Sequence, residues 1–368
     1  MGILMGKVSG LKDKDLVILL FSAVTFFILS FWIHFPGLRP NYYSDIIDVL
    51  WNRYDVRMGK IPYIEYDLEY PAFSGLVLYV ATLTGNVYGY YLVFALVSFV
   101  CMLGSLYIVY RIGVERSVDV YKIGLYTVFT PTFIFYSIYS FDWFGVFFLL
   151  LSLLFLLKEH VRYSGIFLGL SAAARLIPIL VFPYMLQHLK GKKDKIVFTF
   201  CTFLGWLTPN IYFMIVNFDG FLYPYFYQAG WVVEDSWLAI FQQYNKGVSA
   251  GLMFILAYLI FYLEKVDVMD KCWLVLTAFV ISSFKFPPQY MIMLMPFFAL
   301  SCKDYVPYIF SHIFNVMILF WWFTPMFSFG NPWSIESPVQ WSAIIRQALI
   351  AYIFVKSIRL YLRKGSLP

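Results

Sequence analysis

Charged residues are scarce in this chain. Only 13% of its 368 residues are Asp, Glu, Lys or Arg, against about 25% in a typical soluble domain, whereas 61% are hydrophobic and 22% aromatic. The mean hydropathy of +0.75 leaves no stretch polar enough for a separate soluble domain. We therefore predict an all-α polytopic membrane protein, residues 1–368 forming one integral membrane domain with about 11 to 13 transmembrane helices.

Cysteine and nucleotide-binding motifs are also scarce. The four cysteines lie in or beside apolar segments without the paired spacing of metal ligands, so we interpret them as small core residues. The chain contains no P-loop, dinucleotide fingerprint, HExxH motif or serine elbow, so no soluble nucleotide cofactor is implied. The net charge is +6, but the basic residues form no stripe of the kind that binds nucleic acid. We therefore expect membrane lipids, and no nucleic acid, as partners.

The apolar residues come in long continuous runs. Those that predict membrane helices are 16–35, 87–110, 121–139, 142–157, 164–174, 176–189, 196–217, 248–263, 272–286, 288–301, 307–327 and 339–356. The segment 71–86 is shorter and carries Thr, Gly and Asn, so we expect it to dip into the membrane and return.

The distribution of Lys and Arg predicts the orientation. With the dip at 71–86, 19 of the 27 basic residues fall on one side, which the positive-inside rule makes cytoplasmic. We therefore expect an integral protein of the cell membrane with both termini in the cytoplasm. The polar segments that composition does not explain gather on the extracytoplasmic face, at 36–70, 142, 175, 218–245, 285–290 and 328–338.

The first of these loops, 36–70, is rich in acids. Six of the chain's 21 acidic residues lie there, namely Asp45, Asp48, Asp55, Glu65, Asp67 and Glu69. Such a patch can hold a general base, a divalent cation or a proton pathway, or can simply be solvated. Asp45 and Asp48 are three residues apart among apolar residues, so on an amphipathic helix along the membrane surface their carboxylates would share a face.

Four charged residues lie in or beside apolar runs. Asp142 opens a helix, where capping alone would explain an acid. Arg175 lies between two half-length runs, which we expect to form a hairpin with Arg175 at its outer tip; a cation there suits a phosphate, or a salt bridge to a loop acid. Lys285, which could snorkel to the interface, and Arg346, inside the last run, are further candidate cations.

The loop 218–245 is rich in aromatic residues. An interfacial belt would explain this enrichment of Tyr and Trp. Aromatic faces beside Asp235, Gln242 and Gln243 would equally suit stacking on a sugar ring.

Three stretches together resemble the GT-C superfamily of integral membrane glycosyltransferases, especially its polyprenyl-phosphate-dependent, mannosyltransferase-like branches. They are YSDIIDVLWNRYDVRMGKIPYIEYDLEYP, then SFDWFGVFFLLLSLLFL with YSGIFLGLSAAARLIPILVFPY, and KFPPQYMIMLMP. The first has an acid after the first helix, a Gly-x-x-Pro-Tyr turn and an acid-Tyr-Pro close. Two departures are Arg175, where a lysine is common, and Pro287, which replaces the usual serine.

The resemblance implies an inverting transfer of a sugar, mannose in those branches, from a polyprenyl-phosphate donor to a glycolipid or glycan acceptor at the extracytoplasmic face. In it, the catalytic base is Asp45, with Asp48 as the alternative. The donor phosphate is held by Arg175, with Gln289 and Tyr290 nearby, and from its place in the sequence we add Lys285 as a further candidate for binding that phosphate. Glu69 orders the substrates, and we add Tyr70, Asp142 and Arg346 as candidate substrate-binding residues.

No cofactor is required by this interpretation, and a divalent cation held by acids of the first loop stays an open alternative. A lipid-linked polysaccharide polymerase or ligase would share the donor and the outer site. A secondary transporter would instead place its charged groups near the membrane midplane, in paired repeats that are not evident here.

Overall fold

The computed structural model describes residues 9–38, 42–323 and 330–365, in which every regular element is a helix and none is a strand. Four helices are long and apolar enough to cross a membrane: Lys14–Ile33 within α1 (Ser9–Ile33), α4 (Val87–Glu115), α10 (Lys192–Val216) and α15 (Tyr305–Phe323). The predicted all-α architecture is therefore confirmed, and the four helices indicate a membrane protein.

The other elements are shorter or less apolar. They are η1 (Asp45–Trp51), α2 (Tyr54–Arg57), α3 (Ala72–Thr82), α5 (Val120–Tyr126), α6 (Pro131–Tyr136), α7 (Asp142–Leu157), α8 (Val161–Ala174), η2 (Ile177–Val181), α9 (Phe182–His188), α11 (Phe218–Gly230), η3 (Trp237–Tyr244), α12 (Asn245–Phe261), α13 (Val268–Ser282), η4 (Pro288–Tyr290), α14 (Met291–Ser301) and α16 (Pro338–Gly365).

Two of the predicted segments differ from the structure. The run 121–139 is not one helix, because the chain leaves the helix after Tyr126 and restarts at Pro131, where the Thr130 hydroxyl caps the Phe133 amide. The segment 218–245, expected as a loop, is largely helical. Parts of the predicted segments at 324–329, together with Lys7 and Arg39, lie outside the described residues.

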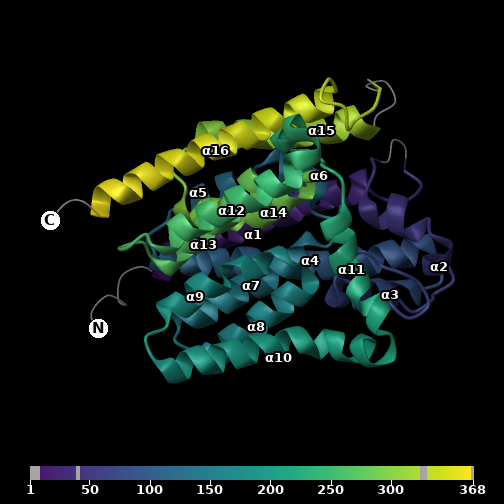
Figure 1. The fold of residues 1–368 in the computed structure, drawn as a ribbon, viewed down its shortest axis with the longest axis horizontal. Coiled ribbons are helices and arrows are strands. Elements are labelled where there is room, and N and C mark those ends of the chain that lie inside the picture. Colours follow the sequence, from purple (N-terminus) through teal and green to yellow (C-terminus); the bar gives the residue numbers. More distant parts are fainter. Residues whose placement is uncertain (1–8, 39–41, 324–329, 366–368) are drawn as a thin grey trace.

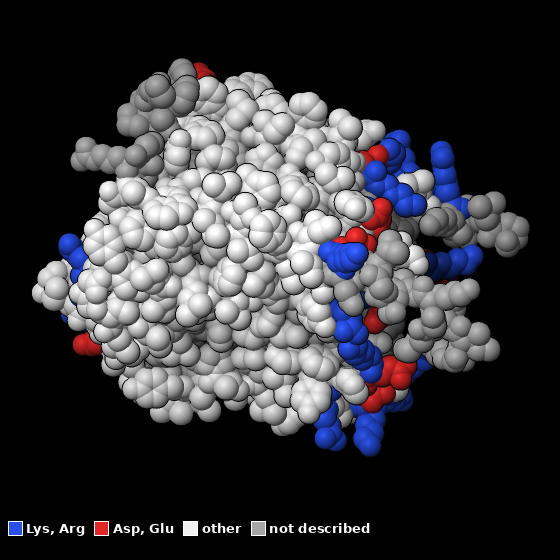
Figure 2. All heavy atoms as spheres, turned by 180° about the vertical axis from the view of Figure 1, so that it is seen from behind, with Lys and Arg blue, Asp and Glu red and all other residues white. Residues whose placement is uncertain are grey.

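The helices form an elongated bundle in which the described chain starts and stops at the same end (Figure 1). We call this the terminal end, and the opposite end, where α1 finishes and α2 and α3 lie, the cavity end. On the face that Figure 2 shows, charged side chains gather at the terminal end, and a broad surface without them extends between the two ends. This pattern is typical of a protein whose middle contacts lipid.

Ion pairs join the helices at the terminal end. Arg116, which follows α4, donates to Asp267 at 3.0 Å and to Asp270 at 3.2 Å at the start of α13. Lys356 of α16 pairs with Asp304 before α15. These contacts link segments that are far apart in the sequence where the bundle meets water.

The segment 71–86 does not cross the bundle. Its helix α3 has 11 residues, a length of about 16 Å against the roughly 30 Å of a bilayer core. It follows Tyr70, which lines the cavity described below, and α4 then begins near the end of α1, where the Tyr91 hydroxyl donates to the Phe31 carbonyl at 2.7 Å. Both ends of the segment therefore lie at the cavity end.

Glycines allow α8 and α10 to pack closely. A side chain at Gly169 would place its Cβ 2.1 Å from the Thr202 carbonyl, and one at Gly205 would lie 2.1 Å from the Ile166 carbonyl. Small residues of this kind let helix backbones approach one another in membrane proteins. The contact holds α8 in place, and α8 ends at Ala174, so that Arg175 begins the turn into η2 and α9.

Candidate active site

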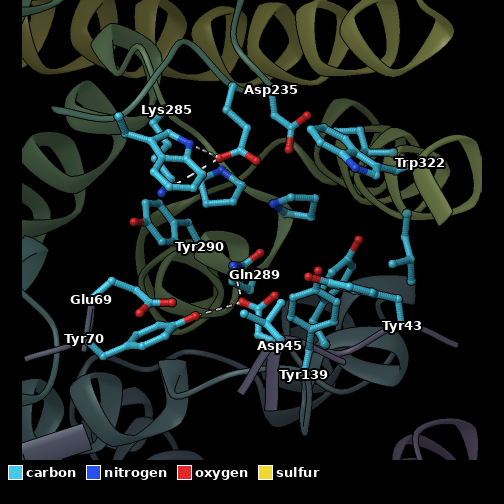
Figure 3. Close-up of a pocket in the computed structure, with 18 of the residues that line it drawn as sticks. Tyr43, Asp45, Glu69, Tyr70, Tyr139, Asp235, Lys285, Gln289, Tyr290 and Trp322 are labelled. Carbon is cyan, nitrogen blue, oxygen red and sulfur yellow. Dashed lines mark hydrogen bonds and ion pairs between the residues drawn. The ribbon is translucent and has the colours of Figure 1, made fainter. Parts of the chain in front are cut away.

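A polar cavity of about 300 Å³ lies at the cavity end (Figure 3). Its walls come from η1 and the residues before α3, from α11 and the segment after it, from η4, and from the end of α15. Of the residues predicted for the site, those that line the cavity are Asp45, Glu69, Tyr70, Arg175, Lys285, Gln289 and Tyr290. Segments separated by more than two hundred residues thus meet around one space.

Asp45 is the acid at the floor of the cavity. Its Oδ2 accepts hydrogen bonds from the Tyr70 hydroxyl and from Gln289 Nε2, both at 3.2 Å (Figure 3). Burial raises the pKa of the Asp45 carboxyl to about 7, Arg175 opposes this effect, and Asp142 adds to it. An acid that titrates near neutrality and faces a cavity fits the requirements of a general base.

Asp48 does not face this cavity. The two acids lie on a π-helical turn, η1, rather than on an α-helix, so residues three apart do not share a face. The Asp48 Oδ2 instead accepts the Ser44 backbone amide at 2.7 Å. The two carboxylates therefore do not share a face as expected, and of the two only Asp45 lines the cavity. The expected amphipathic helix is also only this seven-residue turn, which buries Ile46, Ile47 and Leu50 against the bundle.

Glu69 is already paired within the protein. Arg53 donates to both of its oxygens, through Nη1 to Oε2 at 2.7 Å and through Nη2 to Oε1. The Glu69 carbonyl also accepts from Gln228 Nε2 at 3.1 Å. This bidentate pair fixes the wall between η1 and α3, so Glu69 shapes the cavity and Arg53 supplies a cation that lines it.

Arg175 lies beside the cavity in a partly aromatic setting. Its Nη2 donates to Asp142 Oδ2 at 2.8 Å and to Ser140 Oγ at 2.9 Å, and its guanidinium carbon is 5.4 Å from the centre of the Tyr70 ring. The salt bridge that was the alternative to phosphate binding therefore exists, with Asp142 rather than with an acid of the first loop. Its Nε has no hydrogen-bond partner among the described residues.

Asp142 does not line the main cavity, in contrast to the prediction that it binds substrate. It is 5% exposed, at the first residue of α7, and its carboxylate accepts from Arg175. Its role in the structure is to hold the guanidinium in place. Gly145, one turn further along α7, makes room for the same side chain, since a Cβ there would lie 2.9 Å from Arg175 Cβ.

Lys285 faces the cavity from the wall opposite Asp45 (Figure 3). Its Nζ is 3.8 Å from Glu234 Oε2, 3.3 Å from Gln228 Oε1 and 4.0 Å from the centre of the Trp231 ring. Trp231 Nε1 donates to the same Glu234 oxygen at 2.7 Å. Burial raises the pKa of Glu234, and Lys285 and this hydrogen bond oppose the rise.

An apolar groove of about 430 Å³ adjoins the polar cavity. Its apolar lining comes from Leu176, Ile177, Ile179, Leu180, Phe279 and Phe284, and Ile179 is 39% exposed at the outer surface. The cavity and the groove share six lining residues, which are Glu69, Tyr70, Arg175, Gln228, Lys285 and Tyr290. Two cations thus stand on the boundary between a polar space and an apolar one.

Arg346, which we predicted as a substrate-binding residue, lies outside both spaces. It is completely buried, donates to Asn315 Oδ1 at 2.6 Å and to the Asp235 carbonyl at 2.9 Å, and also donates to the Phe286 carbonyl. These bonds tie α15 and α16 to the two loops behind the cavity. The residue braces the wall from which Asp235 and Lys285 reach the cavity.

Several cavity residues were missed by the sequence reasoning. Glu234 and Arg53 received no role, and Tyr227 and Trp231 were counted only among the aromatic residues of 218–245. The spacing of Tyr223, Tyr227 and Trp231 was a usable signal, because aromatic residues four apart lie on one face of a helix. In α11 and just after it their rings do lie in series, tilted to one another, with centres 5.5 and 4.9 Å apart.

Within the described ranges, no three His, Cys, Asp or Glu side chains come together as metal ligands would. The four cysteines are buried and unpaired.

No known family model matches this chain, and no curated protein matches it either.

Proposed function

We propose that the chain is a membrane glycosyltransferase that moves a sugar from a polyprenyl-phosphate donor to a glycolipid or glycan acceptor. The observation that carries the proposal is the boundary between the apolar groove and the polar cavity, where Arg175 and Lys285 stand. The site thus has an apolar part, a pair of cations and a polar part, and a lipid-linked sugar phosphate has an apolar chain, a phosphate and a sugar in the same order. Its chain fits the groove, its phosphate the two cations, and its sugar the cavity that holds Asp45.

The chemistry follows from this placement. Asp45 takes the proton from an acceptor hydroxyl, whose oxygen attacks the anomeric carbon of the sugar. The bond between that carbon and the phosphate oxygen breaks, and the electron pair leaves with the polyprenyl phosphate. Arg175 and Lys285 stabilise the charge that develops on it. A single displacement of this kind inverts the anomeric configuration.

The proposal extends to membrane placement. Beyond the four helices that are long enough alone, we propose that the shorter apolar elements complete about 11 to 13 crossings and dips, as in the GT-C superfamily. The terminal end, with its basic residues, then faces the cytoplasm, and the cavity end faces away from it. Nucleotide sugars do not reach that outer side, which is why the donor is lipid-linked.

The test is a transfer assay with the purified protein in nanodiscs. Labelled polyprenyl-phosphate mannose and, separately, a labelled nucleotide sugar are supplied with a membrane glycolipid extract. We expect label in the extract only with the lipid-linked donor, and loss of transfer by at least about a hundredfold in Asp45→Asn. Asp48→Asn is the matched control, because it makes the same change three residues away and outside the cavity. Transfer from the nucleotide sugar alone would refute the proposal.

A further inference from the structure

Asp235 is a buried acid whose side chain has no assigned partner. It is 2% exposed, it lines the polar cavity, and its Oδ1 accepts no hydrogen bond from the part of the chain that the structure describes. Figure 3 shows it on the wall across the cavity from Asp45, with Trp322 at its side. A buried carboxyl oxygen left without a donor is costly, and such groups call for a ligand or another explanation.

The backbone at Asp235 is strained as well. Its φ of +50° lies in the left-handed region, which residues other than glycine rarely adopt. Such a conformation persists where its surroundings over-determine it, and it tends to occur at functional sites. Because aspartate adopts this region more often than most side chains, the backbone conformation alone does not assign a function to Asp235.

The surroundings hold this turn firmly. Arg346 donates to the Asp235 carbonyl at 2.9 Å, and the Ser236 hydroxyl donates to the Ser283 carbonyl at 2.7 Å. The Trp237 amide donates to Gln347 Oε1, also at 2.7 Å. These bonds use the Asp235 carbonyl, the Ser236 hydroxyl and the Trp237 amide, and none of them uses the Asp235 carboxyl group, which lines the cavity.

The position relative to the boundary cations indicates which ligand group it meets. Asp235 follows Glu234 directly, and Glu234 pairs with Lys285 at the edge of the apolar groove. A phosphate at Lys285 therefore places the sugar that it carries next to Asp235. Trp322 and Trp333 line the same part of the cavity and offer flat apolar faces to a pyranose ring.

We propose that Asp235 binds a hydroxyl group of the donor's sugar and so helps to select which sugar is transferred. The inference rests on the proposed function, since it needs a lipid-linked sugar in the cavity. Burial raises the pKa of the Asp235 carboxyl well above its ordinary value, and Glu234 raises it further. A sugar hydroxyl suits either protonation state, because it both donates and accepts.

The test compares two lipids, polyprenyl-phosphate mannose and polyprenyl phosphate without a sugar, by equilibrium binding to the protein in nanodiscs. Asp235→Gly removes the carboxyl group and keeps the left-handed backbone, which glycine adopts freely. We expect this variant to bind the mannosyl lipid about tenfold to a hundredfold more weakly and the sugar-free lipid as the wild type does. Asp235→Asn retains a hydrogen-bond acceptor, so its affinity for the mannosyl lipid should fall less than that of Asp235→Gly.

A matched control makes the same kind of exchange elsewhere. Glu159 is exposed, has a φ of +62° and lies outside the cavity, so Glu159→Gly should change the binding of neither lipid. Equal weakening of both lipids in Asp235→Gly would show a structural role and overturn the inference, as would unchanged binding of both. If the wild type binds neither lipid, the proposed function itself fails, which is a different result from either of these.

Discussion

At the scale of single residues, Asp45 differs from the other acids of its loop in what surrounds it. Glu69 is neutralised by Arg53 and Asp48 caps a backbone amide, whereas Asp45 accepts two long hydrogen bonds of 3.2 Å and lines the cavity. Its carboxyl is therefore the one among these three that remains available to take a proton from a ligand in the cavity.

The first prediction concerns pH. A base acts in its deprotonated form, and burial raises the pKa of Asp45 to about 7. We expect the transfer rate, measured at a low donor concentration, to fall about tenfold per pH unit below 7 and to level off above it. A rate that stays constant down to pH 5 would show that Asp45 is not the base.

The residues around Asp45 also show what sequence reasoning can and cannot reach. The residue types of the candidate site were recognisable from the sequence: an acid after the first helix, an arginine between half-length apolar runs, and a lysine before Pro287. Their partners were not, because Arg175 and Asp142 are 33 positions apart and Gln289 and Asp45 are 244 apart. Pairings over such separations depend on the packing of the helices, which a single sequence does not display.

At the scale of elements, the type of each helix determines which of its side chains line the cavity. The π-helical turn η1 separates Asp45 from Asp48, and α11 brings Tyr227 and the start of the next segment to the wall. The turn at Arg175 was predictable because apolar runs of half length and flanking basic clusters both indicate a turn. The helix α11 was not foreseen, since its many aromatic residues were interpreted as part of a loop that forms an interfacial belt or stacks on a sugar ring.

The second prediction concerns the contact between α7 and the turn after α8. A methyl group at Gly145 would lie 2.9 Å from Arg175 Cβ and would displace the guanidinium from the cavity boundary. We expect Gly145→Ala to weaken binding of polyprenyl-phosphate mannose by about tenfold. Gly251→Ala in α12 is the control, because nothing lies within 4 Å of its Cβ position and donor binding should not change. Equal binding by the two variants would contradict this role of Gly145.

At the scale of the whole molecule, the bundle has two chemically different ends. Charged residues and the ion pairs of Arg116 and Lys356 mark the terminal end, and the cavity and the groove lie at the other. Composition predicted the apolar middle correctly. It did not predict how many helices are long enough to cross alone, because several apolar runs are broken at prolines or end in short turns.

The third prediction concerns this polarity. The four native cysteines are buried, so single cysteines introduced at exposed sites can be labelled selectively. We expect Lys193→Cys, at the start of α10, and Trp333→Cys, at the cavity, to react with a membrane-impermeant maleimide from opposite sides of sealed vesicles. Labelling of both from the same side would contradict the proposed orientation.

The central claim is that Arg175 holds a lipid-linked sugar phosphate while Asp45 performs the chemistry on it. The most direct measurement follows bound and transferred label from polyprenyl-phosphate mannose in one nanodisc preparation. Asp142→Asn combined with Arg175→Gln removes the cation without leaving its buried partner charged.

We expect Asp45→Asn to bind the donor as the wild type does and to transfer none of it. The double variant should lose about tenfold or more in donor affinity. Transfer by Asp45→Asn at the wild-type rate, or donor binding unchanged by the loss of Arg175, would contradict the claim.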